Sequence, residues 1–177
     1  FIFPITIFLM YLGYKEGGTH YLLSFFIFGI SICLLYLAST IYHMLPVKDN
    51  IIKILKKIDH MMIFVLIAGT YTPVCLISLN NKFGYSILSL VWVIAIFGII
   101  LKFFWINAPR WFSTSIYVIM GWLSVFAFFP LIRAIELNGI LLLLLGGIIY
   151  TIGAVIYATK YPKISIKSFG FQEIFHL

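Results

Sequence analysis

The chain has 177 residues, of which 63% are hydrophobic and only 10% are charged, whereas soluble domains carry about a quarter charged residues. Its net charge of +7 is compatible with nucleic acid, but the twelve Lys and Arg residues are scattered through short loops instead of clustering on one face. The composition therefore excludes an ordinary soluble domain and argues against nucleic-acid binding, and we expect an integral membrane protein.

Apolar runs separated by polar residues predict membrane-spanning helices, each of which needs about 20 mostly uncharged residues. In chain order the expected spans are 1–14, 21–45, 60–80, 83–101, 111–132, 137–159 and 169–177. The first and last runs are short, and both ends of the chain open inside apolar or motif-bearing sequence, so we expect residues to be missing at both ends. The prediction is an all-α, seven-transmembrane helical bundle that forms a single domain over 1–177.

Loop charges predict the orientation, because cytoplasmic loops carry an excess of Lys and Arg. One side carries Lys15, Lys82 and Arg133. The other side carries Lys48, Lys53, Lys56, Lys57, Lys102, Arg110, Lys160, Lys163 and Lys167. This nine-to-three excess predicts that the N-terminus lies inside and the C-terminus outside a cell membrane.

The basic segment that follows the second span has two interpretations. Asp49 is a candidate N-cap, and Ile51, Ile54, Leu55 and Ile58 recur at helical spacing between lysines. The segment is either an amphipathic helix that anionic lipid holds at the inner surface, or a solvated basic loop that obeys the rules of topology.

Ionisable side chains inside a span are costly and are usually paired or functional, so they indicate the candidate site. Ser39 and His43 lie four residues apart at the end of the second span, and residues at this spacing share one helix face. Asp59 and His60 open the third span. His60 is turned about 100° from Asp59 around a helix, so we expect it to support the site or to contact a neighbouring helix rather than to act as a metal ligand.

A third polar pair, Gln172 and His176, lies in the last stretch, again four residues apart. With the predicted orientation, all three groups converge at the cytoplasmic ends of their helices. Imidazoles, a carboxylate and a hydroxyl within an apolar bundle are groups with which proteins bind zinc and activate water for hydrolysis. The alternative is that the histidines only form hydrogen bonds at the membrane interface. His20, on the outer side, is expected to be a surface residue.

Five motifs follow one another along the chain: Ser39-x-x-x-His43, Asp59-His60 with Ala68-Gly69-Thr70-Tyr71-Thr72-Pro73, Tyr117-x-x-Met120-Gly121-Trp122, Gly147-x-x-Tyr150-Thr151-x-Gly153-Ala154 and Phe171-Gln172-Glu173-Ile174-Phe175-His176. In this order they resemble the haemolysin III branch of the progestin and adipoQ receptor family, which includes the adiponectin receptors. The resemblance covers nearly the whole chain.

The resemblance implies zinc near the cytoplasmic face, held by one histidine of the second helix and two of the seventh. By position, His43 and His176 are the implied metal ligands, while Asp59 and Ser39 are the implied catalytic or water-orienting residues. The first histidine of the seventh-helix pattern is replaced here by Gln172, and a carboxamide is a poorer zinc ligand than an imidazole. Either Asp59 closes in as a third ligand, or this member has lost its metal.

Three functions remain open from the sequence, so it does not decide whether the chain is an enzyme. The first is an intramembrane zinc hydrolase of a lipid amide or ester. The second is a non-catalytic membrane receptor or a sensor of lipid homeostasis. The third is cytolytic, pore-forming activity, against which the apolar spans argue because they supply few charges to line a wide channel. Membrane lipids are the expected partners in all three cases.

Overall fold

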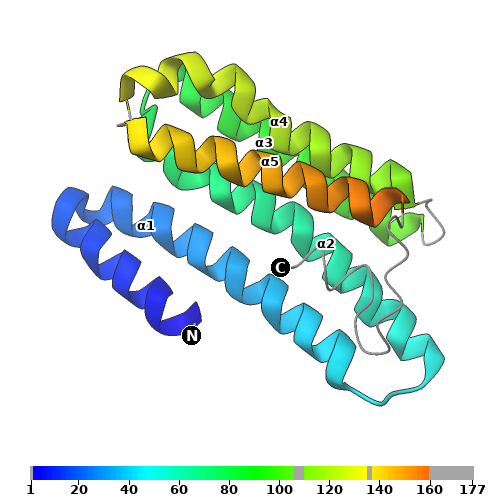
Figure 1. Ribbon diagram of the computed structural model, residues 1–177. Coiled ribbons are helices and arrows are strands. Elements are labelled where there is room, and N and C mark those ends of the chain that lie inside the picture. The colour runs from blue at the N-terminus through cyan, green and yellow to red at the C-terminus, as the bar shows by residue number, and fades with distance from the viewer. Residues whose placement is uncertain (1, 106–109, 135–136, 160–177) are drawn as a thin grey trace. The chain divides into compact units, whose positions relative to one another are not determined.

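The computed structural model describes residues 2–105, 110–134 and 137–159, and these are helical apart from short connections, with no strand among them. The helices are α1 (Ile2–Met44), α2 (Asp49–Pro73), the π-helix η1 (Val74–Ser78), α3 (Lys82–Phe104), α4 (Arg110–Ala134) and α5 (Leu137–Thr159) (Figure 1). Contacts divide the chain into two compact units, Phe1–Ile106 and Asn107–Leu177, which are described separately below. The all-α prediction is confirmed for the described residues.

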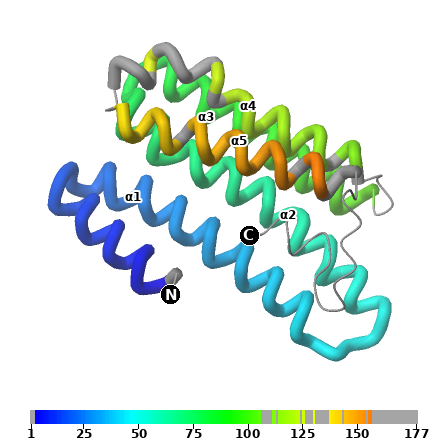
Figure 2. The backbone as a smooth tube through the Cα atoms, viewed as in Figure 1, coloured from blue at the N-terminus to red at the C-terminus, as the bar shows by residue number. Residues whose placement is uncertain are grey.

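α1 consists of two helical arms that fold back on each other at a glycine pair. Gly17 and Gly18 leave helical geometry, and Gly18 has φ of 65°, a left-handed conformation that glycine adopts without steric cost. The arms pack closely, because a Cβ added to Gly29 would collide with Thr6. The tube in Figure 2 follows this reversal near the N-terminus. The two arms correspond to the first two predicted spans.

α2 begins well before the predicted third span. The basic segment is neither a loop nor a separate surface helix, because it forms the first turns of one continuous helix that starts at Asp49. Lys48 occupies the N-cap position, so the prediction that Asp49 caps the helix is wrong. The Asp49 carboxylate still lies in the first turn, where the helix dipole favours a negative charge.

Pro73 ends the α-helical part of α2, because proline has no backbone N–H to donate. The next turn is the π-helix η1, in which the Leu79 N–H donates to the Val74 carbonyl at 3.0 Å. Beside this turn, Trp92 Nε1 of α3 donates to Thr72 Oγ1 at 3.4 Å. The chain remains helical through Pro73, so α2 and η1 form one continuous rod.

Small residues determine how closely the helices of the first unit approach. Gly69 of α2 lies against Ser31 of α1, and an added Cβ would collide with that side chain. Gly98 of α3 receives the Phe64 ring of α2 in the same way. Ser31 and Phe64 are both only 1% exposed. Lipid tails are as apolar as the side chains, so membrane helices associate through such close packing more than through hydrophobic burial.

In the second unit, α4 and α5 pack through residues of two sequence motifs. A Cβ added to Gly121 would lie 3.1 Å from the Tyr150 ring, so these residues are in close contact. Trp122 Nε1 donates to Thr151 Oγ1 at 3.2 Å, and the Thr151 hydroxyl donates to the Gly147 carbonyl at 2.7 Å. Gly121, Trp122, Tyr150 and Thr151 therefore hold the two helices together, while the bond to Gly147 lies within α5.

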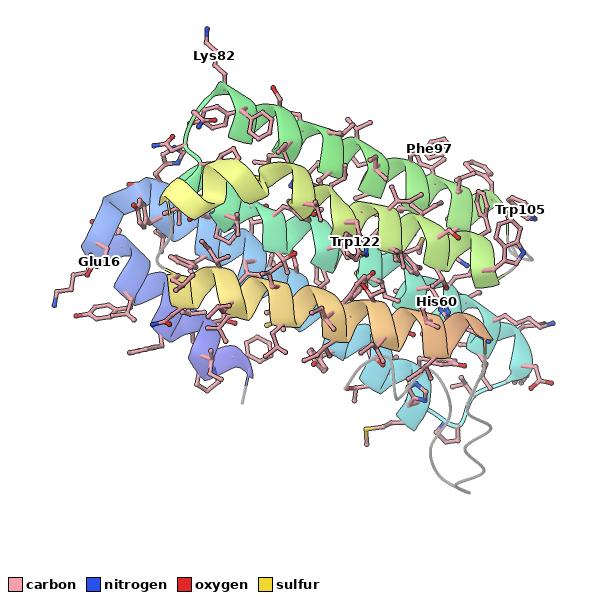
Figure 3. The ribbon with its side chains drawn as sticks, turned by 45° about the horizontal axis from the view of Figure 1, so that its top comes forward. Glu16, His60, Lys82, Phe97, Trp105 and Trp122 are labelled. Carbon is pink, nitrogen blue, oxygen red and sulfur yellow. The ribbon has the colours of Figure 1, made fainter. Side chains whose placement is uncertain are left out.

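Three helical segments of the described chain are long and apolar enough to cross a membrane: Phe3–Met44, which contains both arms of α1, Asp49–Ser78 and Lys82–Phe104. Large apolar side chains cover their outer surfaces, as Phe97 of α3 does with 57% of its area exposed (Figure 3). Such a surface suits contact with lipid. Seven spans and their orientation stay predictions, and the span expected over 169–177 lies outside the described residues.

We predict that Gly69→Ala lowers the stability of the first unit by about 1–3 kcal/mol, because the added Cβ has no room beside Ser31. The apparent melting temperature of the detergent-solubilised protein, followed by tryptophan fluorescence, measures the effect. Gly146→Ala is the matched control, since an added Cβ there meets no described atom within 4 Å. Removing the opposing Cβ with Ser31→Gly in the Gly69→Ala background should restore stability. Equal melting temperatures for the two single variants would contradict this packing.

Candidate functional site

The contact between Gly69 and Ser31 fixes the register of α2 against the second arm of α1. The two helices run antiparallel, joined by a short connection after Met44 (Figure 1). Both rise about 1.5 Å per residue, so equal numbers of residues cover equal lengths. Asp59 lies ten residues before Gly69 on α2. On α1, the position ten residues after Ser31 lies midway between Ser39 and His43. Measured along the helix axes, Asp59 is therefore at about the same height as both residues.

The same register places these side chains on one side of the helix pair. With about 100° per residue, Ser39 is turned about 80° from Ser31, and Asp59 about 80° from Gly69. Because the helices are antiparallel, both turns lead to the same side. His43 is turned about 120° in the same sense. By ideal helix geometry, three of the sequence-predicted residues thus fall at the same end and on the same side of the α1/α2 pair.

Asp59 and His60 form the buried part of this candidate site. Asp59 is 0% exposed and His60 is 5% exposed. The His60 Nδ1 lies 2.6 Å from the Lys56 carbonyl oxygen, and since a carbonyl can only accept, this nitrogen carries the proton. The same nitrogen is 3.9 Å from the Asp59 Oδ2. Figure 3 labels His60 on α2.

A histidine anchored through one nitrogen to a backbone carbonyl has a fixed tautomer and ring orientation, as at many metal and proton-transfer sites. The 100° step per residue turns His60 away from the side that Asp59 shares with Ser39, and its supporting role stays a prediction. Its nearly complete burial goes further than the sequence predicted. The only signal in the sequence was the adjacent Asp-His pair, because the carbonyl that His60 contacts one helical turn earlier is a backbone group that any residue would supply.

The remaining candidates lie toward the end of α1 or outside the described residues. Ser39 is half-buried and His43 is exposed, with its ring 4.6 Å from that of Tyr42 in an edge-on contact. Gln172 and His176 fall in the part of the chain that the structure does not describe. Within the described part, no group of three or more His, Cys, Asp or Glu side chains is close enough to hold a metal ion.

Apolar helices of membrane length, packed through small residues and carrying a buried Asp-His pair, define a multi-pass integral membrane protein. The family model described as "Haemolysin-III related" matches residues 1–177, so the chain belongs to the haemolysin III family. This confirms the resemblance drawn from the five motifs. No solved structure matches the chain significantly.

Three relatives illustrate the range of this similarity. The chain is 41% identical to "Hemolysin-3 homolog" of Bacillus subtilis (strain 168) over 157 residues, which cover 89% of this chain and 73% of the relative. It is 40% identical to "Hemolysin-3" of Bacillus cereus over 154 residues, 87% and 70% of the two chains. The human "Monocyte to macrophage differentiation factor" is 25% identical over 138 residues, 74% and 56% of the two chains.

The register of α1 against α2 can be tested by cross-linking in a background that lacks the free cysteines Cys33 and Cys75. Ala38 and Met62 each lie seven residues from the Ser31–Gly69 contact, so both face the partner helix. We expect Ala38→Cys with Met62→Cys to be joined by a short bis-maleimide, as a peptide map would show. In the control pair, Met61→Cys replaces Met62→Cys and points to another side of α2. Efficient cross-linking of the control pair alone would show a different register.

Proposed function

We propose that this protein is a membrane-embedded, zinc-dependent hydrolase that cleaves an amide or ester bond of a lipid. One observation carries the proposal: the Asp59 carboxylate is completely buried in a helix of membrane length, level with Ser39 and His43. Burying an ionisable group within such a bundle costs free energy, and residues of this kind usually belong to functional sites. The excess of Lys and Arg in the nearby loops supports placing this end on the cytoplasmic side of the cell membrane.

The donor atoms present are of the kinds that zinc takes, imidazole nitrogen and carboxylate oxygen. In this proposal His43 of α1 and His176 hold the metal, and Asp59 lies beside it. Gln172 stands where the family pattern has a histidine, so we expect binding to be weaker than with three imidazoles. When bound, zinc lowers the pKa of a water molecule to about 7 and so supplies a nucleophile.

The protein's own residues have distinct tasks in this proposal. Asp59 takes the proton of the attacking water, because its carboxylate is the buried base at this end of the helix pair. Ser39, level with Asp59, orients that water through its hydroxyl group. His60 positions Asp59, since its ring is fixed by the Lys56 carbonyl. The apolar helices around them exclude bulk water and present a surface along which a lipid substrate approaches from the bilayer.

Metal content tests the ligand set directly. We expect the purified full-length protein to contain about one zinc ion per chain by elemental mass spectrometry, and His43→Ala or His176→Ala to remove it. His20→Ala is the matched control, because His20 is exposed at the opposite end of the same arm of α1. Gln172→His should slow the loss of zinc to a chelator.

Two results would contradict the metal site. Zinc retained at parental level in His43→Ala would exclude this histidine as a ligand. Zinc absent from the parent protein and present only after Gln172→His would show that this member has lost its metal. The hydrolase proposal would then give way to a non-catalytic role in the membrane.

Asp59→Asn tests the base separately from the metal. We expect this variant to keep its zinc but to hydrolyse a fluorogenic N-acyl lipid amide, or the matched ester, about 10²–10⁴-fold more slowly, as loss of a general base implies. Asp49→Asn, which changes an exposed carboxylate on the same helix, should retain the parental rate. If the zinc-loaded parent cleaves neither lipid, the proposed hydrolysis of a lipid amide or ester is contradicted. If Asp59→Asn is fully active, another group takes the proton.

A further inference from the structure

Successive contacts join α2 to α3 in one antiparallel register. At one end, the Lys57 Nζ of α2 donates to the carbonyl oxygen of Phe103 of α3 at 3.2 Å. Seven residues further along α2, the Phe64 ring fills the space beside Gly98, which lies five residues before Phe103. The hydrogen bond between the two helices beside the π-helical turn continues this progression. The Lys57 bond therefore belongs to the same register as the apolar packing, and it closes the α2/α3 interface at the end where Asp59 lies.

The Lys57 ammonium caps the C-terminus of α3. The last carbonyl groups of a helix have no N–H partner within it, and they carry the negative end of the helix dipole. The Leu101 carbonyl accepts the Trp105 N–H at 2.8 Å, and the Phe103 carbonyl accepts the bond from Lys57. Figure 3 labels Trp105 at this end of α3. The same ammonium lies 5.7 Å from the centre of the Phe103 ring, which is within the range of a cation–π contact. Lys57 thus attaches α2 to the end of α3 in two ways.

Lys57 lies closer to Asp59 along α2 than the packing contacts do. At a rise of 1.5 Å per residue, Lys57 is about 3 Å from Asp59 along the helix axis, Phe64 about 7.5 Å and Gly69 about 15 Å. The hydrogen bond of the His60 ring to the backbone lies within α2, whereas the bond of Lys57 reaches another helix. The position of the turn that contains the buried Asp59 therefore depends on Lys57 more than on the packing further along the helix.

We propose that Lys57 is a positioning residue for the candidate site: by capping α3, it holds in place the turn of α2 that carries Asp59 and keeps that carboxylate buried. Without this bond, the first turns of α2 separate from the end of α3 and water reaches position 59. The Phe64–Gly98 contact remains, so the movement is confined to this end of the interface. The role of Asp59 as a base rests on the proposed function, but its positioning by Lys57 requires neither metal nor turnover.

Thiol labelling measures this positioning without an assay of activity. In full-length protein that lacks Cys33 and Cys75, Asp59→Cys places a thiol at a position that is 0% exposed. We expect Lys57→Met to raise its rate of reaction with N-ethylmaleimide at least about tenfold, as loss of a hydrogen bond from a charged group implies. Lys57→Arg keeps the donor and the charge and should keep the parental rate. Lys53→Met changes an exposed lysine one turn earlier and is the matched control.

A second reporter separates a local movement from a general loosening of the first unit. The native Cys75 is 0% exposed, and in protein that lacks only Cys33 it should stay protected when Lys57→Met is introduced. If Cys75 reacts faster as well, Lys57 supports the whole unit and the proposal is overturned. An unchanged rate at position 59 would overturn it too. If Asp59→Cys does not fold, Ile63→Cys takes its place with the same expected result, since Ile63 is 6% exposed one turn later.

Hydrolysis provides a separate test that links this role to the proposed function. In the zinc-loaded protein, we expect Lys57→Met to keep its zinc and its KM but to lower kcat about 10²-fold, because a misplacement of about 1 Å costs that much. Lys57→Arg should restore kcat. A parental kcat in Lys57→Met would overturn the role of Lys57 in the reaction. A protein that cleaves no lipid, yet shows the expected change in labelling, would contradict the proposed function and establish the positioning by Lys57.

Discussion

The close contact between Gly69 and Ser31 is the constraint on which the arrangement of the first unit depends. Two helices in lipid gain little from burying apolar surface, so their alignment follows from the shapes that fit together. The missing Cβ of Gly69 selects one alignment, and that alignment brings Asp59 level with Ser39 and His43. A shift of one residue along α2 would turn the carboxylate by about 100° and separate it from both. The packing of a glycine in mid-helix thus determines the geometry of a polar site more than two helical turns away.

The sequence predicted the helices well because apolar length is a local property. The reversal at Gly17 and Gly18 separates the two arms of α1 as the two apolar runs implied. The helical spacing after Asp49 predicted a helix there as one of two alternatives, but its continuity with the third span was missed. Hydropathy does not distinguish a helix that continues beyond the apolar region from a separate segment. The register between helices could not be predicted, because the sequence around a small residue does not specify which residue of the neighbouring helix lies opposite it.

The motifs behind the family resemblance do not all serve one purpose. Gly121, Trp122, Tyr150 and Thr151 join α4 to α5 through a close contact and a hydrogen bond, so these residues serve helix packing. Asp59 differs, since a buried carboxylate has no packing advantage over an apolar side chain of similar size. The sequence predicted Asp59, Ser39 and His43 for the candidate site, and this site stays a prediction: the structure shows Asp59 buried, while ideal helix geometry places the other two on the same side of the helix pair. His176 stays a prediction, because it lies outside the described residues.

The π-helical turn after Pro73 contains about one residue more than an α-helical turn needs. Deleting one residue within Val74–Ser78 would let this turn relax to an α-helix, with the adjustment passing toward the connection to α3. The part of α2 that precedes Pro73, with Gly69 and Asp59, would keep its position against α1. No π-helical turn lies between Asp59 and Gly69 to absorb a deletion, so a deletion there would rotate the carboxylate out of place. The tolerance of this span to changes in chain length is therefore expected to differ sharply on the two sides of a single proline.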